Sequence, residues 1–261
     1  MRRVSGRVAL VTGAARGIGA ATVRALAADG WSVVAVDRAA DDPRLPYRMG
    51  TRAELEALAS DRVRTVVADA CDETALRAAV AQAEQEFGGL DAALAVAGVI
   101  AGGTPLWEMP AAELDAVLDV DLRAVVALAR AAIPALLRRP EPRSGRFVAV
   151  ASAAATRGLP MLAAYCAAKA GVTGLVRALA VELGRTGVTV NAVSPGSTDT
   201  PILAESARLY GLGAAADFAP QQPFGRLLDP AEVAAALVWL AGPGSSGMTG
   251  AVLPVDGGLA L

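Results

Sequence analysis

Two side chains four residues apart, Tyr165 and Lys169, could together move a proton. The stretch Ala163–Gly184 has a helical pattern, so residues at this spacing share one face. An ammonium beside a phenol favours the phenolate, and we expect Lys169 to lower the pKa of Tyr165 from about 10 toward the working pH. Ser152, at the end of a strand-like run, could donate a hydrogen bond to a carbonyl or a developing alkoxide. These side chains predict general acid/base chemistry.

The composition argues against chance as the source of this pair. The chain has 23 Arg and a single Lys, so arginine fills its other basic positions. Arginine keeps its proton, whereas lysine offers a compact ammonium with three donors. With three Tyr present, a randomly placed lysine would follow one at this spacing about once in ninety. An ordinary surface pair is the alternative interpretation.

A glycine-rich turn follows the first strand-like run and could bind the pyrophosphate of a dinucleotide. Gly13, Gly17 and Gly19 let the backbone turn tightly and approach phosphates, whose charge the next helix N-terminus stabilises. No Lys-Ser/Thr pair follows the last glycine, so the turn is not a P-loop. Its position between a strand and a helix favours a nucleotide site over a plain turn.

Asp37 ends the second strand-like run, 18 residues beyond Gly19. A carboxylate there can accept hydrogen bonds from the adenosine ribose hydroxyls and would repel a 2′-phosphate. Arg16 and Arg38 argue the other way, since either could face such a phosphate. We weigh the fixed carboxylate more heavily and predict NAD rather than NADP, with a surface loop cap as the alternative. Asp69, closing the third run, could meet the adenine amino group or merely precede a turn.

These residues lie on a regular alternation of strand-like and helix-like segments. Strands are predicted at Arg7–Thr12, Ser32–Val36, Arg64–Ala68, Ala92–Ala97, Arg146–Ser152, Val188–Val193 and Ala251–Val255. Their near-continuous hydrophobicity indicates burial on both faces. Helices are predicted at Gly19–Asp29, Glu73–Phe87, Ala111–Leu137, Ala163–Gly184 and Pro230–Ala241. The pattern predicts one α/β domain over 1–261, a doubly wound, seven-stranded parallel sheet with helices on both faces.

Two irregular segments follow strand ends and should overhang the ligand edge of the sheet. Arg38–Gly50 delays the third strand, and we predict a cofactor-covering insertion near 38–60. Asp199–Phe224 is predicted to form a substrate lid. Apolar residues that could line the site predict a fairly apolar substrate, although core or subunit contacts would explain them equally well: Leu203, Leu209, Tyr210, Leu212, Phe218, Trp107 and Met161.

Composition removes several classes of function. The net charge of −2 gives no electrostatic reason to expect nucleic acid or an anionic membrane. With no His, and with Cys71 and Cys166 lacking metal spacing, we expect no metal site. No apolar run approaches the ~20 residues of a membrane span, because Arg130 interrupts the longest. The basic stretch Met1–Gly6 lacks the apolar run of a signal peptide. A cytoplasmic location is therefore expected.

The motifs together resemble those of the short-chain dehydrogenase/reductase family. They occur in that family's order over essentially the whole chain: Thr12-Gly-x-x-x-Gly-x-Gly19, Asp37, Ser152, Tyr165-Cys-Ala-Ala-Lys169, Asn191-Ala-Val-Ser-Pro-Gly196 and Thr249-Gly-Ala-Val-Leu-Pro-Val-Asp-Gly-Gly258. The resemblance implies a Rossmann fold, a nicotinamide cofactor and usually a homotetramer. It implies that Tyr165 is the acid/base, that Lys169 also holds the nicotinamide ribose, and that Ser152 orients the substrate oxygen. The cofactor contacts expected are Gly13, Arg16, Gly17, Ile18, Gly19, Asp37, Arg38, Asp69, Ala70, Ala97, Gly98, Tyr165, Lys169, Pro195, Gly196, Thr198 and Thr200.

Two stretches look like the mycofactocin-associated, NAD-dependent members of this family. One is the insertion after Asp37, with Pro46-Tyr47 and Thr51–Leu55; the other is Ala151–Pro160. In that group the insertion is thought to cover the NAD and leave it poorly exchangeable. The resemblance implies that electrons pass to a peptide-derived redox carrier.

The chain departs from the family pattern at two places. Ala95-Val96-Ala97-Gly98 replaces the usual Asn-Asn-Ala-Gly, and Asp121 stands where the catalytic Asn is expected. That Asn supports a water linking Lys169 to solvent, largely through its backbone carbonyl. A carboxylate could pair with Lys169, or a buried extra charge could disturb the proton path. We predict an active enzyme with Asp121 in the relay region.

The leading hypothesis is hydride transfer between a secondary alcohol or ketone and NAD, with Tyr165 moving the hydroxyl proton. The runner-up is an NADP-dependent 3-oxoacyl-thioester reductase, which a basic residue in place of Asp37 would have favoured. A non-catalytic NAD-binding sensor or scaffold is the alternative from another class. Loss of Tyr165 or Lys169 would have supported it, and both are present.

Overall fold

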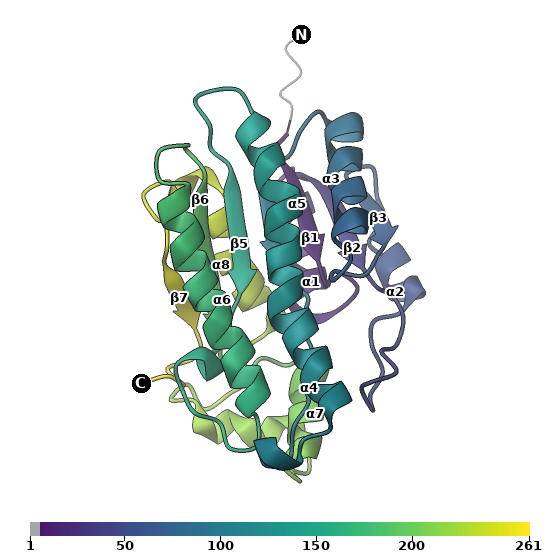
Figure 1. The fold of residues 1–261 in the computed structure, drawn as a ribbon, viewed down its shortest axis with the longest axis vertical. Helices are drawn as coiled ribbons and strands as arrows, with labels where there is room; N and C mark the ends of the chain where they lie inside the picture. Colours follow the sequence, from purple (N-terminus) through teal and green to yellow (C-terminus); the bar gives the residue numbers. More distant parts are fainter. Residues whose placement is uncertain (1–5) are drawn as a thin grey trace.

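Seven short apolar strands pair in parallel in the computed structural model, which describes residues 6–261 (Figure 1). Their spatial order is β3-β2-β1-β4-β5-β6-β7. Strands are therefore added on one side of β1 up to β3 and on its other side from β4 onward. This confirms the predicted doubly wound sheet. The basic stretch 1–5, for which we expect no signal peptide, lies outside the described residues. The strands are β1 (Val8–Thr12), β2 (Ser32–Asp37), β3 (Val63–Val67), β4 (Ala92–Ala95), β5 (Arg146–Val150), β6 (Thr189–Pro195) and β7 (Val252–Val255).

Helices cover both faces of the sheet. Helices α3 (Glu73–Phe87), α5 (Ala124–Arg138) and α6 (Ala163–Glu182) lie in front of it in Figure 1, and α1 (Gly17–Ala28) and α8 (Pro230–Ala241) lie behind. The bounds predicted for α3 and α8 are confirmed. Both helices begin at a capping aspartate, which marks the helix start in the sequence. The N-cap carboxylates of Asp72 and Asp229 accept hydrogen bonds from backbone N–H groups of the first turns.

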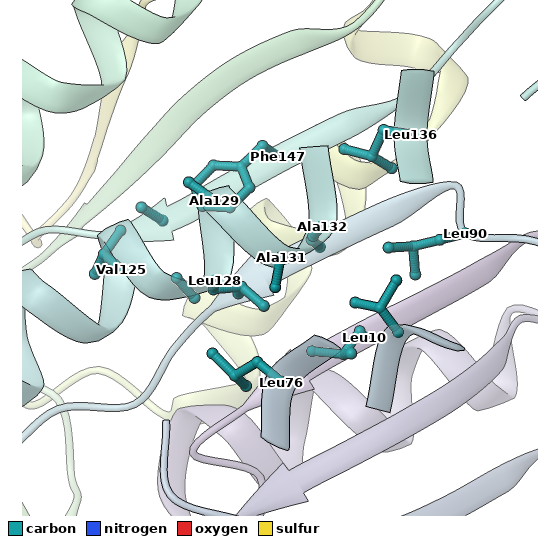
Figure 2. Close-up of a cluster of buried hydrophobic side chains, with 14 of the residues drawn as sticks. Leu10, Leu76, Leu90, Val125, Leu128, Ala129, Ala131, Ala132, Leu136 and Phe147 are labelled. Carbon is teal, nitrogen blue, oxygen red and sulfur yellow. The ribbon is translucent and has the colours of Figure 1, made fainter. Parts of the chain in front are cut away.

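The front helices pack on the sheet through small and branched aliphatic residues. Alanines on one face of α5 let this helix lie close to the strands, and larger side chains fill the space beside them. Figure 2 shows these side chains meeting Leu10 of β1, Phe147 of β5 and Leu76 of α3. A second cluster joins α1 and α8 to the other face of the sheet. The two clusters hold the strand ends in fixed positions.

The predicted helix over 111–137 is divided in the structure. Helix α4 (Ala111–Leu118) passes into a π-helical turn, η2 (Asp119–Arg123), before α5 begins. Such a turn inserts one extra residue into the helix and is frequent at functional sites. Asp121 lies in this turn and is 0% exposed. The turn therefore places a carboxylate inside the protein.

Of the two segments predicted to be irregular, Arg38–Gly50 contains no helix or strand in the structure. The wider insertion near 38–60 also includes α2 (Arg52–Glu56), which begins at a capping box formed by Thr51 and Glu54. The prediction that 199–224 is irregular is wrong, since α7 (Pro201–Leu209) and the 3₁₀ helix η4 (Ala215–Gln221) fill most of it. The Thr200 cap and Pro201 at the first helical position were the available signals. The remaining 3₁₀ turns are η1 (Leu106–Glu108), η3 (Ala153–Ala155) and η5 (Pro243–Ser245).

Helix α6 is, by length and composition, apolar enough to cross a membrane. In this fold it is a core helix, because Val172, Val176 and Ala180 pack into the front cluster against the sheet. It also carries Tyr165 and Lys169 near its N-terminal end, beside the carboxyl ends of the strands. The helix thus joins the core to the candidate site.

Candidate active site

A cavity of about 610 Å³ opens at the carboxyl edge of the sheet. Ends of β1, β2, β5 and β6 contribute to its lining, together with α6, α7 and the segment after Asp37. The sequence-predicted site residues all line it: Gly13, Arg16, Gly17, Ile18, Gly19, Asp37, Arg38, Asp69, Ala70, Ala97, Gly98, Asp121, Ser152, Tyr165, Lys169, Pro195, Gly196, Thr198 and Thr200. Residues far apart in sequence are therefore brought to one concave surface.

The glycine turn is shaped by close backbone contacts. Gly13 has a φ of 68°, and a Cβ there would lie 2.6 Å from the Cα of Ala97. A Cβ on Gly19 would collide with the carbonyl oxygen of Gly13. The hydroxyl of Thr12 accepts hydrogen bonds from the N–H groups of Val96 and Ala97, at 3.2 and 3.4 Å. Through this hydroxyl β1 supports the loop after β4, where the family's two asparagines are missing.

Asp37 is held by the backbone at the end of β2. Its Oδ2 accepts from the N–H of Ala15 at 3.0 Å, and its Oδ1 accepts from the N–H of Ala39 at 2.8 Å. Arg38 turns to other carboxylates, those of Asp42 at 2.8 Å and Asp69 at 3.7 Å. A fixed carboxylate therefore faces the cavity beside the glycine turn. Its oxygens could accept hydrogen bonds from the ribose hydroxyls of an adenosine.

The segment after Asp37 returns to the cavity and is held there by ion pairs. Arg44 binds Asp42 at 2.8 Å and Asp119 of η2 at 2.7 Å. The guanidinium of Arg44 is the main reason why the pKa of the Asp42 carboxyl lies far below its usual range. Tyr47 of the same segment accepts a hydrogen bond from the N–H of Ile100 at 2.9 Å. The insertion is thereby joined to the π-helical turn and to the loop after β4.

Lys169 forms a buried ion pair with Asp121. Its Nζ lies 2.9 Å from Asp121 Oδ1 and donates to the carbonyl oxygen of Val150 at 3.2 Å. The same Oδ1 accepts from the N–H of Val99 at 3.3 Å, whereas Oδ2 has no hydrogen-bond partner within residues 6–261. A Cβ on Gly98 would lie 2.9 Å from this Oδ1, so a larger residue there would displace the Asp121 carboxylate.

Both charges of this ion pair affect the pKa of Tyr165. The Lys169 ammonium lies 5.6 Å from the centre of its ring. Burial raises the pKa of Tyr165 above its ordinary value; Asp121 raises it further, while Lys169 and the Ser152 hydroxyl act against them. Lys169 lowers the Tyr165 pKa as predicted, but in the protein alone burial and Asp121 outweigh it and the pKa lies above its ordinary value. The helical spacing of Tyr165 and Lys169 does not reveal this burial.

Burial and charge also shift the two members of the ion pair. Burial raises the pKa of Asp121, and Lys169 opposes this shift. Burial lowers the pKa of Lys169, but Asp121 and Tyr165 outweigh it and leave that pKa above its ordinary value. The ammonium is therefore stabilised at the position where it faces the phenol.

The other end of the cavity is mostly apolar. Of the expected lining, Leu203, Tyr210, Leu212 and Phe218 border the cavity, whereas Leu209, Trp107 and Met161 do not. Trp107 is 84% exposed. The Tyr210 hydroxyl donates to the carbonyl oxygen of Pro160 at 2.7 Å and so fixes α7 against the β5–α6 loop. Sequence reasoning missed further lining residues because nothing in their spacing marks them: Ala154, Arg157, Leu159, Leu162, Ser206 and Leu259.

Comparisons with known proteins agree with this geometry. A family model described as enoyl-(acyl carrier protein) reductase matches residues 13–260. A cis-4-hydroxycyclohexanecarboxylate dehydrogenase from Sinomonas cyclohexanicum is 41% identical, over 97% of this chain and 96% of the relative. A levodione reductase from Leifsonia aquatica is 34% identical, over 98% and 95%. The crystal structure of carveol dehydrogenase from Mycobacterium avium in complex with NAD matches with a TM-score of 0.91 and 32% identity, over 98% of both chains.

Proposed function

The chain belongs to the short-chain dehydrogenase/reductase family, and on that premise we propose that it transfers a hydride between a secondary alcohol or ketone and NAD. The observation that carries the proposal is the convergence of Ser152, Tyr165 and Lys169 with the glycine turn on one cavity. A cofactor supplies the hydride acceptor or donor when bound. The residues of the chain bind and orient the reactants and move the proton.

Tyr165 is proposed as the general acid/base. In the oxidation direction its phenolate takes the proton of the substrate hydroxyl, and in reduction its phenol returns one. Ser152 lies two residues beyond the end of β5, lines the same cavity and holds the substrate oxygen with its hydroxyl. Lys169 lowers the free energy needed to ionise the Tyr165 phenol, and we propose that it also binds the nicotinamide ribose. Pro195, Gly196 and Thr198 are proposed to lie against the nicotinamide.

Asp121 is proposed as a positioning residue that sets the charge around Tyr165. It keeps Lys169 protonated and in place through the 2.9 Å contact. Its own negative charge offsets part of the attraction that Lys169 exerts on the phenolate. The proton relay of this chain would therefore operate through a neutral ion pair, where other family members have an ammonium beside an amide.

NAD is proposed as the cofactor because Asp37 is a fixed anion at the end of β2. A 2′-phosphate at this position would be repelled, since both carboxylate oxygens are anchored by backbone N–H groups. Arg38 is occupied by Asp42 and Asp69 and so offers less to a phosphate. The NAD-bound carveol dehydrogenase supports the same choice.

The proposed substrate is a small cyclic secondary alcohol or the corresponding ketone. The relatives are named for hydroxycyclohexanecarboxylate and levodione, and the solved neighbour for carveol; all three are six-membered rings with a hydroxyl or keto group. The apolar lining by Leu203 and Phe218 suits such a hydrocarbon ring.

We further propose that the insertion near 38–60 covers the cofactor and slows its exchange. Ala40, Asp42, Met49 and Gly50 of this insertion line the cavity, and Arg44 anchors it to η2. Slow exchange would require an external electron acceptor, and a peptide-derived redox carrier fills that role in the mycofactocin-associated group. A homotetrameric assembly and a cytoplasmic location stay predictions.

Two measurements test the proposed function. Native mass spectrometry of the purified protein should detect NAD that resists dialysis, and freely exchanging NADP would contradict the covered-NAD proposal. A panel of cyclic secondary alcohols should then reduce the bound NAD, observed as an absorbance change in a single turnover. If no alcohol of the panel reduces the bound NAD, and no matching ketone oxidises the protein loaded with NADH, the proposed oxidoreductase activity is wrong.

A further inference from the structure

The charged side chains that line the cavity are unevenly distributed. Those at the ends of β1, β2 and β3 lie at the nucleotide end: Arg16, Asp37, Arg38, Asp42 and Asp69. Lys169 and Asp121 form a neutral pair at the centre. At the substrate end, formed by the β5–α6 loop, α7 and η4, Arg157 is the one charged residue among the lining residues of the described chain.

Arg157 is not neutralised by a carboxylate within residues 6–261. Its guanidinium donates to the carbonyl oxygen of Leu259, and its side chain is exposed. Arg38 and Arg208, by contrast, are engaged by Asp42 and Glu205. A guanidinium has five N–H donors, so one carbonyl leaves most of them available to a ligand.

The backbone of Arg157 is fixed beside the catalytic side chains. Its N–H donates to the carbonyl oxygen of Ala153, directly after Ser152, at 3.0 Å. Its own carbonyl oxygen accepts from the thiol of Cys166, the neighbour of Tyr165, at 3.8 Å. The guanidinium therefore extends from a loop held between Ser152 and the first turn of α6.

The cavity lining contributed by the β5–α6 loop, α6 and η4 includes the apolar residues Leu159, Leu162 and Phe218. An anion that reaches this guanidinium gains its charge and the hydrogen bonds that its free N–H groups donate. A single guanidinium matches the single charge and planar fork of a carboxylate.

We propose that Arg157 is an anion subsite for the substrate, which is therefore a secondary alcohol or ketone bearing a carboxylate remote from the reacting carbon. This inference rests on the proposed function for the identity of the reacting group. The apolar side chains would hold the hydrocarbon body, with its oxygen at Ser152 and Tyr165 and its carboxylate at Arg157. Substrate orientation would then be fixed at two ends.

The turnover test compares 4-hydroxycyclohexanecarboxylate with 4-methylcyclohexanol, which has a methyl group in place of the carboxylate. Wild-type protein should prefer the carboxylate, and Arg157→Gln should reduce the ratio of the two kcat/KM values by about 10- to 100-fold. Arg157→Lys should retain part of the preference. Arg177→Gln, an exposed arginine farther along α6, is the matched control and should keep the ratio. An unchanged ratio in Arg157→Gln would overturn the subsite.

A binding test separates this inference from the proposed function. Cyclohexanecarboxylate should bind NAD-loaded wild-type protein in calorimetry, and Arg157→Gln should weaken that binding by a similar factor. This result supports the subsite even if no alcohol is oxidised, in which case only the proposed reaction fails. Equal binding to both proteins, or binding of cyclohexyl phosphate with none of the carboxylate, would overturn the subsite whatever the turnover results.

Discussion

Two aspartates face the same cavity in opposite circumstances. At the end of β2, both oxygens of Asp37 accept backbone hydrogen bonds, so its charge is compensated by groups that cannot titrate. In the π-helical turn, Asp121 has one oxygen on Lys169 and one with no partner in residues 6–261. The first arrangement suits a fixed charge for recognition, and the second suits a charge coupled to proton transfer.

The difference indicates that cofactor recognition and proton transfer use separate parts of the cavity. Backbone donors hold a carboxylate in place and do not change during the reaction, whereas a side-chain ion pair changes its electrostatic field when either member gains or loses a proton. Arg44 joins the two regions, because the insertion that follows Asp37 is tied through it to Asp119, two residues from Asp121. Each region can be perturbed separately, and the link between them can be cut.

The largest loss of activity is expected when the Tyr165 phenol, whose pKa depends on Asp121, is removed. Tyr165→Phe removes the phenol proton and should lower kcat for cyclic alcohol oxidation by about a thousandfold. Cofactor binding should persist, because the glycine turn and Asp37 are untouched. Stopped-flow turnover and calorimetry with NAD measure the two quantities; near-normal turnover would remove Tyr165 from the mechanism.

Asp37→Asn tests the fixed charge while keeping the side-chain shape. Loss of the negative charge removes the repulsion of a 2′-phosphate, so the preference for NAD over NADP should fall about tenfold. The ratio of the two dissociation constants, measured by fluorescence titration, gives the answer. A preference that stays the same would mean that other residues select the cofactor.

The predictable part of the molecule corresponds to the Asp37 region. Short Val-rich strands, glycines between a strand and a helix, and an acidic strand end are local patterns, and each was placed correctly from sequence. The sequence predicts the Asp121–Lys169 contact only as one of two alternatives, because the contact depends on the π-helical turn and on the space beside Gly98. Helix α7 was missed since its few residues are surrounded by glycine and proline signals.

Arg44→Met tests the connection between the two regions. It removes the ion pairs with Asp42 and Asp119, which are worth about 1 kcal/mol at this partial exposure, so NAD should dissociate about fivefold faster. The matched control is Arg48→Met, since Arg48 lies in the same insertion and, within residues 6–261, pairs only with the exposed Asp41. Displacement of bound NAD by excess analogue gives both rates. Equal NAD dissociation rates in the two variants would contradict the proposal that the Arg44 ion pairs slow cofactor exchange.

The charge balance at Tyr165 is tested most directly by the pH dependence of kcat/KM for alcohol oxidation. This rate rises with pH as the phenol loses its proton, and Asp121 raises the Tyr165 pKa while Lys169 lowers it. Cys166 also faces the Tyr165 phenol and is not altered in the test. Asp121 raises the pKa of the buried Tyr47 as well, but Tyr47 does not act on Tyr165. Asp121→Asn should therefore move the rising limb to lower pH, and Asp115→Asn, an exposed carboxylate on α4, should leave it in place. A limb that stays unchanged in Asp121→Asn, or moves to higher pH, would contradict the proposed role of the pair.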